Sequence, residues 1–147
     1  MIEYRKGDIF QSGAFALVNP VNCVGVMGAG LALEFKKRFP ANFVAYKGHC
    51  DRRAMRMGVI FPALTGLDMP RWIFNVPTKH HWKDSSSLAG VESGIVALAR
   101  LVSDVAIPSI AIPALGCGLG SLAWSDVRPL IAREFAASEA RVIVYEP

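Results

Sequence analysis

SIAIPALGCGLG, residues 109–120, begins as an apolar run and ends in a loop that holds three glycines. Ser109 to Ile112 has the continuous apolar character of a strand that is buried on both faces. After the loop, Ser125 is placed to cap a helix whose apolar residues recur through Phe135. A strand that leads through glycines into a helix is typical of an α/β fold with its ligand at the loop.

A second strand, loop and helix of the same kind lie earlier in the chain. Ala14 to Val18 reads as a strand that ends at Asn19-Pro20, where proline forbids continued pairing. The loop up to Gly30 is rich in glycine, and Gly30 to Phe39 has helical apolar spacing. Glycines let backbone N–H groups approach an anion, and a helix N-terminus adds roughly half a positive charge. The two loops together predict a bound diphosphate.

The remaining apolar runs continue the alternation of strands and helices. Strands are expected over 2–4, 59–61, 72–76 and 141–145, and helices over 42–49 and 88–102, the latter after serine hydroxyls at 85–87. Such alternation predicts a mixed central sheet covered on both faces, a three-layer α/β/α arrangement. A length of 147 residues fits one compact domain, so we expect residues 1–147 to form a single unit.

Composition narrows the class of protein. Hydrophobic residues make up 52% of the chain and charged residues 19%, which favours a well-packed protein over a disordered one. No apolar run approaches the roughly 20 residues that cross a bilayer, and the N-terminus resembles no signal peptide. We therefore expect a cytoplasmic monomer without membrane contact. The net charge is +4, and basic residues gather at 36–38 and 52–56, which fits a polyanionic partner without deciding for one.

The cysteines and the loops exclude several kinds of site. Cys23, Cys50 and Cys117 are an odd number without CxxC spacing, which argues against a disulfide framework and against zinc. We expect reduced thiols and no metal. Neither glycine-rich loop is followed by Gly-Lys-Ser/Thr, and neither completes the GxGxxG fingerprint. The patterns of P-loop ATPases and of Rossmann dehydrogenases are therefore absent, and we expect no cofactor.

Several stretches resemble the macrodomain family. They are KGDI at 6–9, LVN at 17–19 and IPALGCG at 112–118, so the resemblance covers essentially the whole chain. MGAGLA at 27–32, FNVPTK at 74–79 and GLGSLAW at 118–124 look closest to the DarG-type DNA ADP-ribosyl glycohydrolases, antitoxins that remove ADP-ribose from thymidine in DNA. The terminal ADP-ribose protein glycohydrolase is a related branch. The resemblance implies a macrodomain fold and an ADP-ribosyltransferase toxin as partner.

The resemblance also implies roles for matching positions. Asp8 would contact the adenine amine, Tyr145 would flank the adenine, and Asn22 would meet the distal ribose. The two glycine-rich loops would hold the diphosphate from opposite sides. The residues expected to bind ADP-ribose are Asp8, Ile9, Asn22, Gly28, Ala29, Gly30, Leu31, Thr78, Gly116, Cys117, Gly118, Leu119, Gly120 and Tyr145.

Lys79 is the residue expected to carry catalysis. An amine at a strand end beside an apolar wall loses solvation, which favours its neutral form and lets it attack the anomeric carbon or shuttle a proton. Its residue type alone favours a solvated lysine or a phosphate clamp. The resemblance assigns it the catalytic role in hydrolysing the bond between ADP-ribose and its acceptor.

One departure from the related protein-directed enzyme bears on the acceptor. That enzyme has an aspartate where Gly120 stands, so the resemblance favours DNA and leaves the acid or base partner of Lys79 unidentified. Two other functions stay open: a non-catalytic ADP-ribose reader, and an O-acetyl-ADP-ribose deacetylase. The deacetylase branch uses an aspartate near its first-loop glycines, and residues 28–31 supply none.

A basic and aromatic cluster follows Lys79 directly. His80, His81 and Trp82 at the mouth of a pocket could stack a base of single-stranded DNA, a contact worth about 1–3 kcal/mol per base. Equally, Trp82 could pack under the following helix. Cys117 lies inside the second loop, where a small buried residue is a simpler interpretation than a nucleophile.

Overall fold

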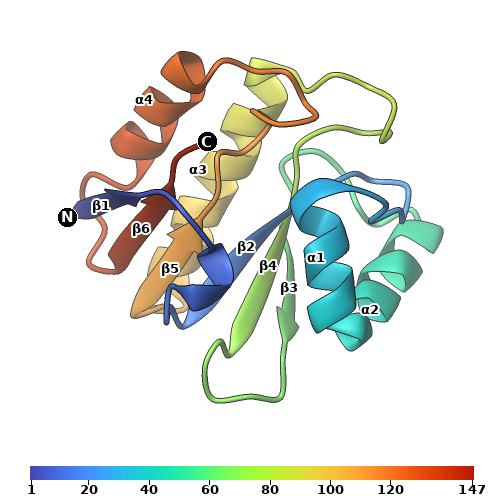
Figure 1. The fold of residues 1–147 in the computed structure, drawn as a ribbon, viewed down its shortest axis with the longest axis horizontal. Coiled ribbons are helices and arrows are strands. Elements are labelled where there is room, and N and C mark those ends of the chain that lie inside the picture. The colour runs from blue at the N-terminus through green and yellow to red at the C-terminus, as the bar shows by residue number, and fades with distance from the viewer.

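A six-stranded sheet forms the centre of the computed structural model, which describes residues 1–147 (Figure 1). Its strands are β1 (Ile2–Arg5), β2 (Ala16–Val21), β3 (Phe61–Leu64), β4 (Trp72–Pro77), β5 (Ser109–Ile112) and β6 (Arg141–Tyr145). Their order across the sheet is β1-β6-β5-β2-β4-β3. All neighbours pair in parallel except β3, which is antiparallel to β4. The prediction of a mixed sheet is confirmed.

Helices cover both faces of this sheet. They are α1 (Gly30–Arg38), α2 (Pro40–Asp51), α3 (Leu88–Asp104) and α4 (Trp124–Glu134), with a short 3-10 helix, η1, at Ile9–Gln11. In Figure 1, α1 and α2 lie together on one side, while α3 and α4 lie together on the other. The predicted three-layer α/β/α arrangement is confirmed.

Alternating side chains along the inner strands fill the two layers between sheet and helices. In β2, Ala16 and Val18 join the large core cluster under α3 and α4, whereas Leu17 joins the cluster that contains Phe35 of α1. Strands β4, β5 and β6 divide their side chains between the same two clusters. This two-residue period places an apolar residue on each face, which is why these strands read as continuous apolar runs.

The long helix α3 follows closely from its sequence. Ser87 is its N-cap, and its Oγ accepts a hydrogen bond of 3.0 Å from the N–H of Gly90. Val91, Ile95 and Leu98 then recur at helical spacing and are buried in the large core cluster. The cap fixes where the helix begins, and the apolar stripe fixes which side faces the sheet.

The predicted ends of two strands, at residues 18 and 61, were wrong. Strand β2 continues through Pro20 to Val21, in register with β4. Its pairing with β5 stops at Leu17, so on that side no ladder remains for Pro20 to interrupt. Strand β3 begins at Phe61 and contains Pro62. It lies at the edge of the sheet and pairs with β4 alone. A proline there can lack its N–H without losing a hydrogen bond to a second neighbouring strand.

Two predictions about helices need correction. Ser125 does not cap α4, because the helix begins at Trp124 and Ser125 is its second residue. The N-cap is Ala123, without a side-chain bond. The helix expected over 42–49 is longer and begins at Pro40. Proline suits the first helical position, since the N–H that it lacks would have no partner inside the helix.

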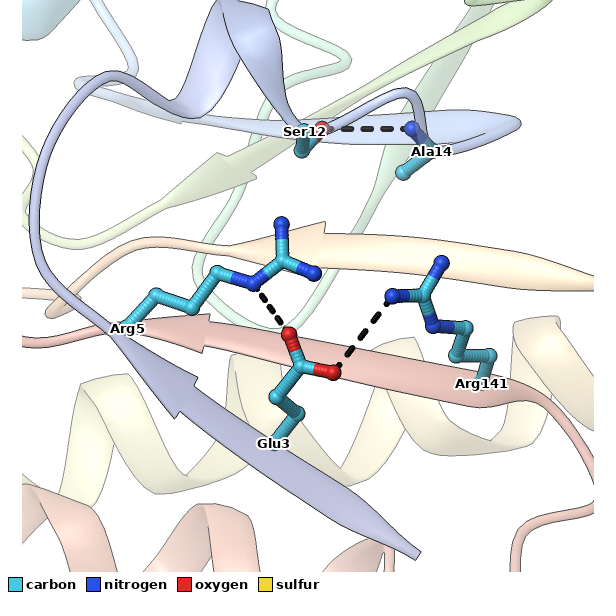
Figure 2. A network of polar contacts seen from close by, with 5 residues as sticks. All are labelled: Glu3, Arg5, Ser12, Ala14 and Arg141. Carbon is cyan, nitrogen blue, oxygen red and sulfur yellow. Dashed lines mark hydrogen bonds and ion pairs between the residues drawn. The ribbon is translucent and has the colours of Figure 1, made fainter.

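The β1 edge of the sheet is lined by charged side chains (Figure 2). One carboxylate oxygen of Glu3 accepts a hydrogen bond from Nε of Arg5. The other accepts a hydrogen bond from Nη2 of Arg141 at 3.4 Å. Figure 2 also shows the turn between η1 and β2, where Ser12 Oγ accepts from the N–H of Ala14 at 3.2 Å. Charges along a short edge strand discourage pairing with another chain.

Three buried asparagines tie the sheet to α2 beneath the first glycine-rich loop. Asn75 Oδ1 accepts from the Nδ2 atoms of Asn19 at 3.0 Å and of Asn42 at 3.1 Å. Asn75 Nδ2 in turn donates to Asn42 Oδ1 at 2.8 Å and to the carbonyl of Phe61 at 3.1 Å. The network therefore joins β2, β3, β4 and α2.

None of the helices has the length and apolar character needed to span a membrane.

Replacing Asn75 with alanine is expected to lower the free energy of unfolding by about 3 kcal/mol, because it leaves several buried polar groups unpaired. Asn42→Ala breaks fewer of these bonds and should cost less. Urea denaturation of the wild type and both variants measures the two losses in the free energy of unfolding. Equal losses, or a loss for Asn75→Ala below about 1 kcal/mol, would contradict a central role for Asn75.

Candidate functional site

A cavity of about 1050 Å³ opens at the carboxyl ends of the parallel strands. We call residues 22–29 loop one and residues 116–120 loop two; both line it. Every residue predicted from the sequence to bind the ligand lines this cavity, namely Asp8, Ile9, Asn22, Gly28, Ala29, Gly30, Leu31, Thr78, Gly116, Cys117, Gly118, Leu119, Gly120 and Tyr145. Lys79 and Trp82 also line it, whereas His80 and His81 do not.

Asn22 holds loop one in shape. Its Oδ1 accepts from the N–H of Val24 at 3.0 Å, and its Nδ2 donates to the carbonyl of Val26 at 2.8 Å. The hydroxyl of Tyr46 lies 2.7 Å from Oδ1 and 2.8 Å from the carbonyl oxygen of Asn22. Burial raises the pKa of Tyr46 far above its ordinary value, so this hydroxyl stays a donor. Asn22 keeps one amide hydrogen for a ligand, and its oxygen is already used.

Loop one leads into a helix start whose donors are free. Ala29, the N-cap of α1, makes no side-chain bond, and the first turn of α1 contains no acidic residue. The N–H groups of Gly28 and Ala29 donate to no backbone acceptor, and those of the first helical residues have none within the helix. Gly30 has a φ of +59°, a conformation that glycine adopts at little cost. The wall here presents N–H groups and the positive end of a helix.

Loop two presents a second set of free donors. It is closed by hydrogen bonds from the N–H of Leu122 to the carbonyl of Gly116 at 2.9 Å and from that of Ser121 to Gly118 at 3.1 Å. The N–H groups of residues 118–120 donate to no backbone acceptor. A Cβ at Gly118 would meet nothing within 4 Å, so the backbone there is open to a ligand. Successive free N–H groups in such a loop make a concave site for an anion.

Gly120 allows loop two to pack tightly. A Cβ added there would collide with Ser86 Oγ and would lie 2.6 Å from the carbonyl oxygen of Gly116. Because the second contact is with backbone, no side chain fits without moving the loop. The structure therefore gives a steric reason for glycine at this position.

The two loops approach each other across the cavity. Leu119 is 70% exposed, and its Cδ1 lies 3.8 Å from the point that a Cβ of Gly30 would occupy. An apolar side chain from loop two thus reaches the start of α1.

Lys79 stands on the wall formed by the end of β4. The N–H of Thr78 donates to the carbonyl of Val21 at 2.9 Å, and the carbonyl of His80 accepts from the N–H of Cys23 at 2.8 Å. These bonds fix the backbone on both sides of Lys79 against the entry to loop one. The side chain is half-buried, and its Nζ lies 3.5 Å from the carbonyl oxygen of Trp82. Lys79 takes part in no ion pair.

Trp82 is available at the mouth of the cavity. Half of its surface is exposed, so it does not pack under α3 in the way that one interpretation of the sequence allowed. Its ring centroid lies 5.3 Å from that of His81, and Lys83 Nζ lies 5.2 Å from the ring. The structure thus presents a half-exposed aromatic ring beside a cation.

Sequence reasoning missed two residues at the end of the cavity near β1. Phe10 and Arg38 both line it, with the guanidinium of Arg38 4.2 Å from the Phe10 ring. Phe10 is placed by η1, which Asp8 caps by accepting from the N–H of Phe10 at 2.9 Å. Arg38 comes from the last turn of α1. Only the basic run at 36–38 signalled the arginine, and nothing in the sequence linked it to Phe10.

The cysteines are protonated thiols. Burial raises the pKa of Cys23 to about 11, and it also raises the pKa of Cys50 and of Cys117. Cys117 lies in the cavity wall without a basic partner, and its Sγ points to the carbonyl oxygen of Leu115 at 3.6 Å. No group of three or more His, Cys, Asp or Glu side chains is arranged to hold a metal ion.

The chain matches one protein family over most of its length. The family described as Macro domain matches residues 18–131. The chain is 43% identical, over 149 aligned residues, to the DNA ADP-ribosyl glycohydrolase of Mycobacterium tuberculosis, covering 100% of this chain and 42% of that protein. It is also 36% identical to a DNA ADP-ribosyl transferase-DNA ADP-ribosyl glycohydrolase fusion protein of Thermosipho africanus, covering 97% of this chain and 41% of that protein. The chain thus spans less than half the length of these relatives.

Solved structures agree with the sequence relatives. The macrodomain of Mycobacterium tuberculosis DarG superposes with a TM-score of 0.97 at 43% identity, covering 100% of this chain and 98% of that one. Thermosipho africanus DarTG in complex with ADP-ribose gives a TM-score of 0.90 at 37% identity, covering 99% of this chain and 41% of that one. Essentially the whole of this chain therefore has the same fold as the matching parts of those structures.

The thiol pKa values predict how the cysteines react. At pH 8 a disulfide reagent such as Ellman's should modify Cys117 more slowly than a free thiol, because a raised pKa leaves less thiolate at that pH. Buried Cys23 and Cys50 should react only after denaturation. The Cys117→Ser variant isolates the two buried thiols. Rapid modification of that folded variant would show that the buried thiols are accessible.

Proposed function

The chain belongs to the macrodomain family, and we propose that residues 1–147 act as one macrodomain that releases ADP-ribose from modified DNA by hydrolysis. One observation carries the proposal: two loops with free backbone N–H groups line a single cavity, and Lys79 stands on its wall at the end of β4. Free N–H groups at glycine loops and a helix start suit a diphosphate. ADP-ribose carries that diphosphate between two riboses.

The cavity fits ADP-ribose in one direction. Asp8 has one carboxylate oxygen left after capping η1, which suits the amine of an adenine, and Tyr145 and Ile9 line the same end. The diphosphate then lies between loop one and loop two. The distal ribose comes to lie near Thr78, Lys79 and the remaining amide hydrogen of Asn22. Its anomeric carbon, which carries the acceptor, points toward the mouth.

Lys79 is the group on that wall that can move a proton. In the proposed reaction the oxygen of water forms a bond to the anomeric carbon, and the bond from that carbon to the acceptor base breaks. One proton of the water is lost, and the departing base gains one. Lys79 either passes a proton to the base or takes one from the water. Gly120 leaves no carboxylate in loop two to share the task.

DNA is the proposed acceptor because of what lies at the mouth. Trp82 offers an exposed ring with Lys83 beside it, a combination that binds single strands by stacking and charge. The net charge of +4 favours a polyanion. The similar proteins are named DNA ADP-ribosyl glycohydrolases, and one of them is fused to a transferase. We accordingly propose thymidine-linked ADP-ribose on single-stranded DNA as the substrate and an ADP-ribosyltransferase toxin as the partner.

Lys79→Ala should reduce release of ADP-ribose from thymidine-ADP-ribosylated single-stranded DNA by at least about a hundredfold, because proton transfer contributes that much or more. Binding of free ADP-ribose, measured by calorimetry, should stay within about threefold, since the loops remain. Lys37→Ala, on the exposed side of α1, is the control and should behave as the wild type. A wild type that binds ADP-ribose and releases none would identify a reader instead.

Trp82→Ala should weaken binding of modified single-stranded DNA about tenfold, in line with the loss of one stacked base. Affinity for free ADP-ribose should not change, because the ring lies at the mouth. Trp82→Phe keeps an aromatic face and should recover most of the loss. Fluorescence anisotropy with labelled DNA measures all three proteins. Equal DNA affinities would remove Trp82 from the substrate contact.

A further inference from the structure

Ser86 carries a buried hydroxyl without a partner. The residue lies in the segment between Trp82 and α3, is 7% exposed, and its Oγ makes no hydrogen bond. Its neighbours differ, since Ser85 is exposed and Ser87 caps α3. A buried donor that is left unpaired costs stability, so native structures nearly always pair such groups. The hydroxyl of Ser86 therefore needs an explanation beyond packing.

The hydroxyl lies directly behind loop two. The N–H of Ser86 donates to the carbonyl of Gly120 at 3.0 Å. Ser86 Oγ occupies the place that a side chain at Gly120 would need, and Ser86 Cβ lies 3.3 Å from the corresponding point at Gly116. Gly116 and Gly120 both line the cavity. One backbone layer thus separates the hydroxyl from a ligand.

The carbonyls of loop two offer candidates for the missing acceptor. Those of Gly116, Gly118 and Gly120 already accept backbone hydrogen bonds, whereas those of Cys117 and Leu119 accept none. Of these two, Leu119 directly precedes Gly120, the residue against which Ser86 Oγ packs. Leu119 shares its peptide group with the N–H of Gly120, which is one of the free donors. A trans peptide points its N–H and its C=O in opposite directions. When that N–H turns toward an anion in the cavity, the carbonyl of Leu119 turns toward the interior.

We propose that Ser86 is a positioning residue for loop two, whose hydroxyl donates to the carbonyl of Leu119 when the N–H of Gly120 turns onto a bound diphosphate. The inference rests on the proposed binding of ADP-ribose between the loops. Ser86 touches no substrate atom and acts through the loop. It also connects the loop to the segment that carries Lys79 and Trp82, so that the phosphate site and the reacting end keep a fixed separation.

The proposal predicts opposite effects of one substitution on two quantities. Ser86→Ala removes a donor that has no partner without ligand, so the melting temperature of the free protein should stay the same or rise. The same change should raise the Kd for ADP-ribose about tenfold, because the carbonyl of Leu119 loses its donor in the complex. Differential scanning fluorimetry and calorimetry measure the two. Ser85→Ala, from the same segment, should change neither.

Ser86→Cys replaces the hydroxyl with a somewhat larger thiol that is a weaker donor, and should give an intermediate Kd. This variant maintains the test should alanine fail to fold. A Kd for Ser86→Ala equal to that of the wild type would overturn the proposal. So would a clear fall in the melting temperature of the free protein, which would show that the hydroxyl is already paired, for example to a buried water. Should the wild type not bind ADP-ribose, the proposed function itself would be wrong.

Discussion

Unpaired backbone N–H groups at the carboxyl edge of the sheet are the feature on which the site depends. Parallel strands bring their carboxyl ends to one edge, and two of them, β2 and β5, continue there into glycine-rich loops. A buried N–H without an acceptor costs free energy unless water or a ligand meets it. Two loops that keep such donors free, facing one cavity, are arranged for an anion rather than for packing alone.

Polar groups behind the loops hold this arrangement. Asn22 and Tyr46 fix loop one, and Asn19, which is bonded to Asn75, contacts Met27 of the same loop. Gly120 allows loop two to lie against Ser86, where a side chain would force it away. The proposed chemistry falls to Lys79, whose backbone is bonded on both sides to the strand and loop beside it. The proposed binding and catalysis thus depend on groups that hydrogen bonds hold in place.

Much of this could be predicted from the sequence because the strands are buried on both faces. β5 and β6 have the predicted bounds, and all the expected ligand residues line one cavity. The end of β2 was predicted wrongly because the effect of Pro20 depends on which neighbouring strand pairs with it. The pairing of Phe10 with Arg38 and the clash behind Gly120 join residues distant in sequence, so only the fold reveals them. Local sequence patterns predict helices, strands and loops, whereas contacts between loops are seen only in the folded structure.

A crystal structure with ADP-ribose bound tests the central claim most directly. It should show phosphate oxygens within hydrogen-bonding distance of N–H groups from both loops, with Nζ of Lys79 facing the anomeric carbon of the distal ribose. A nucleotide bound elsewhere on the sheet edge, or a Lys79 amine turned away into solvent, would contradict it.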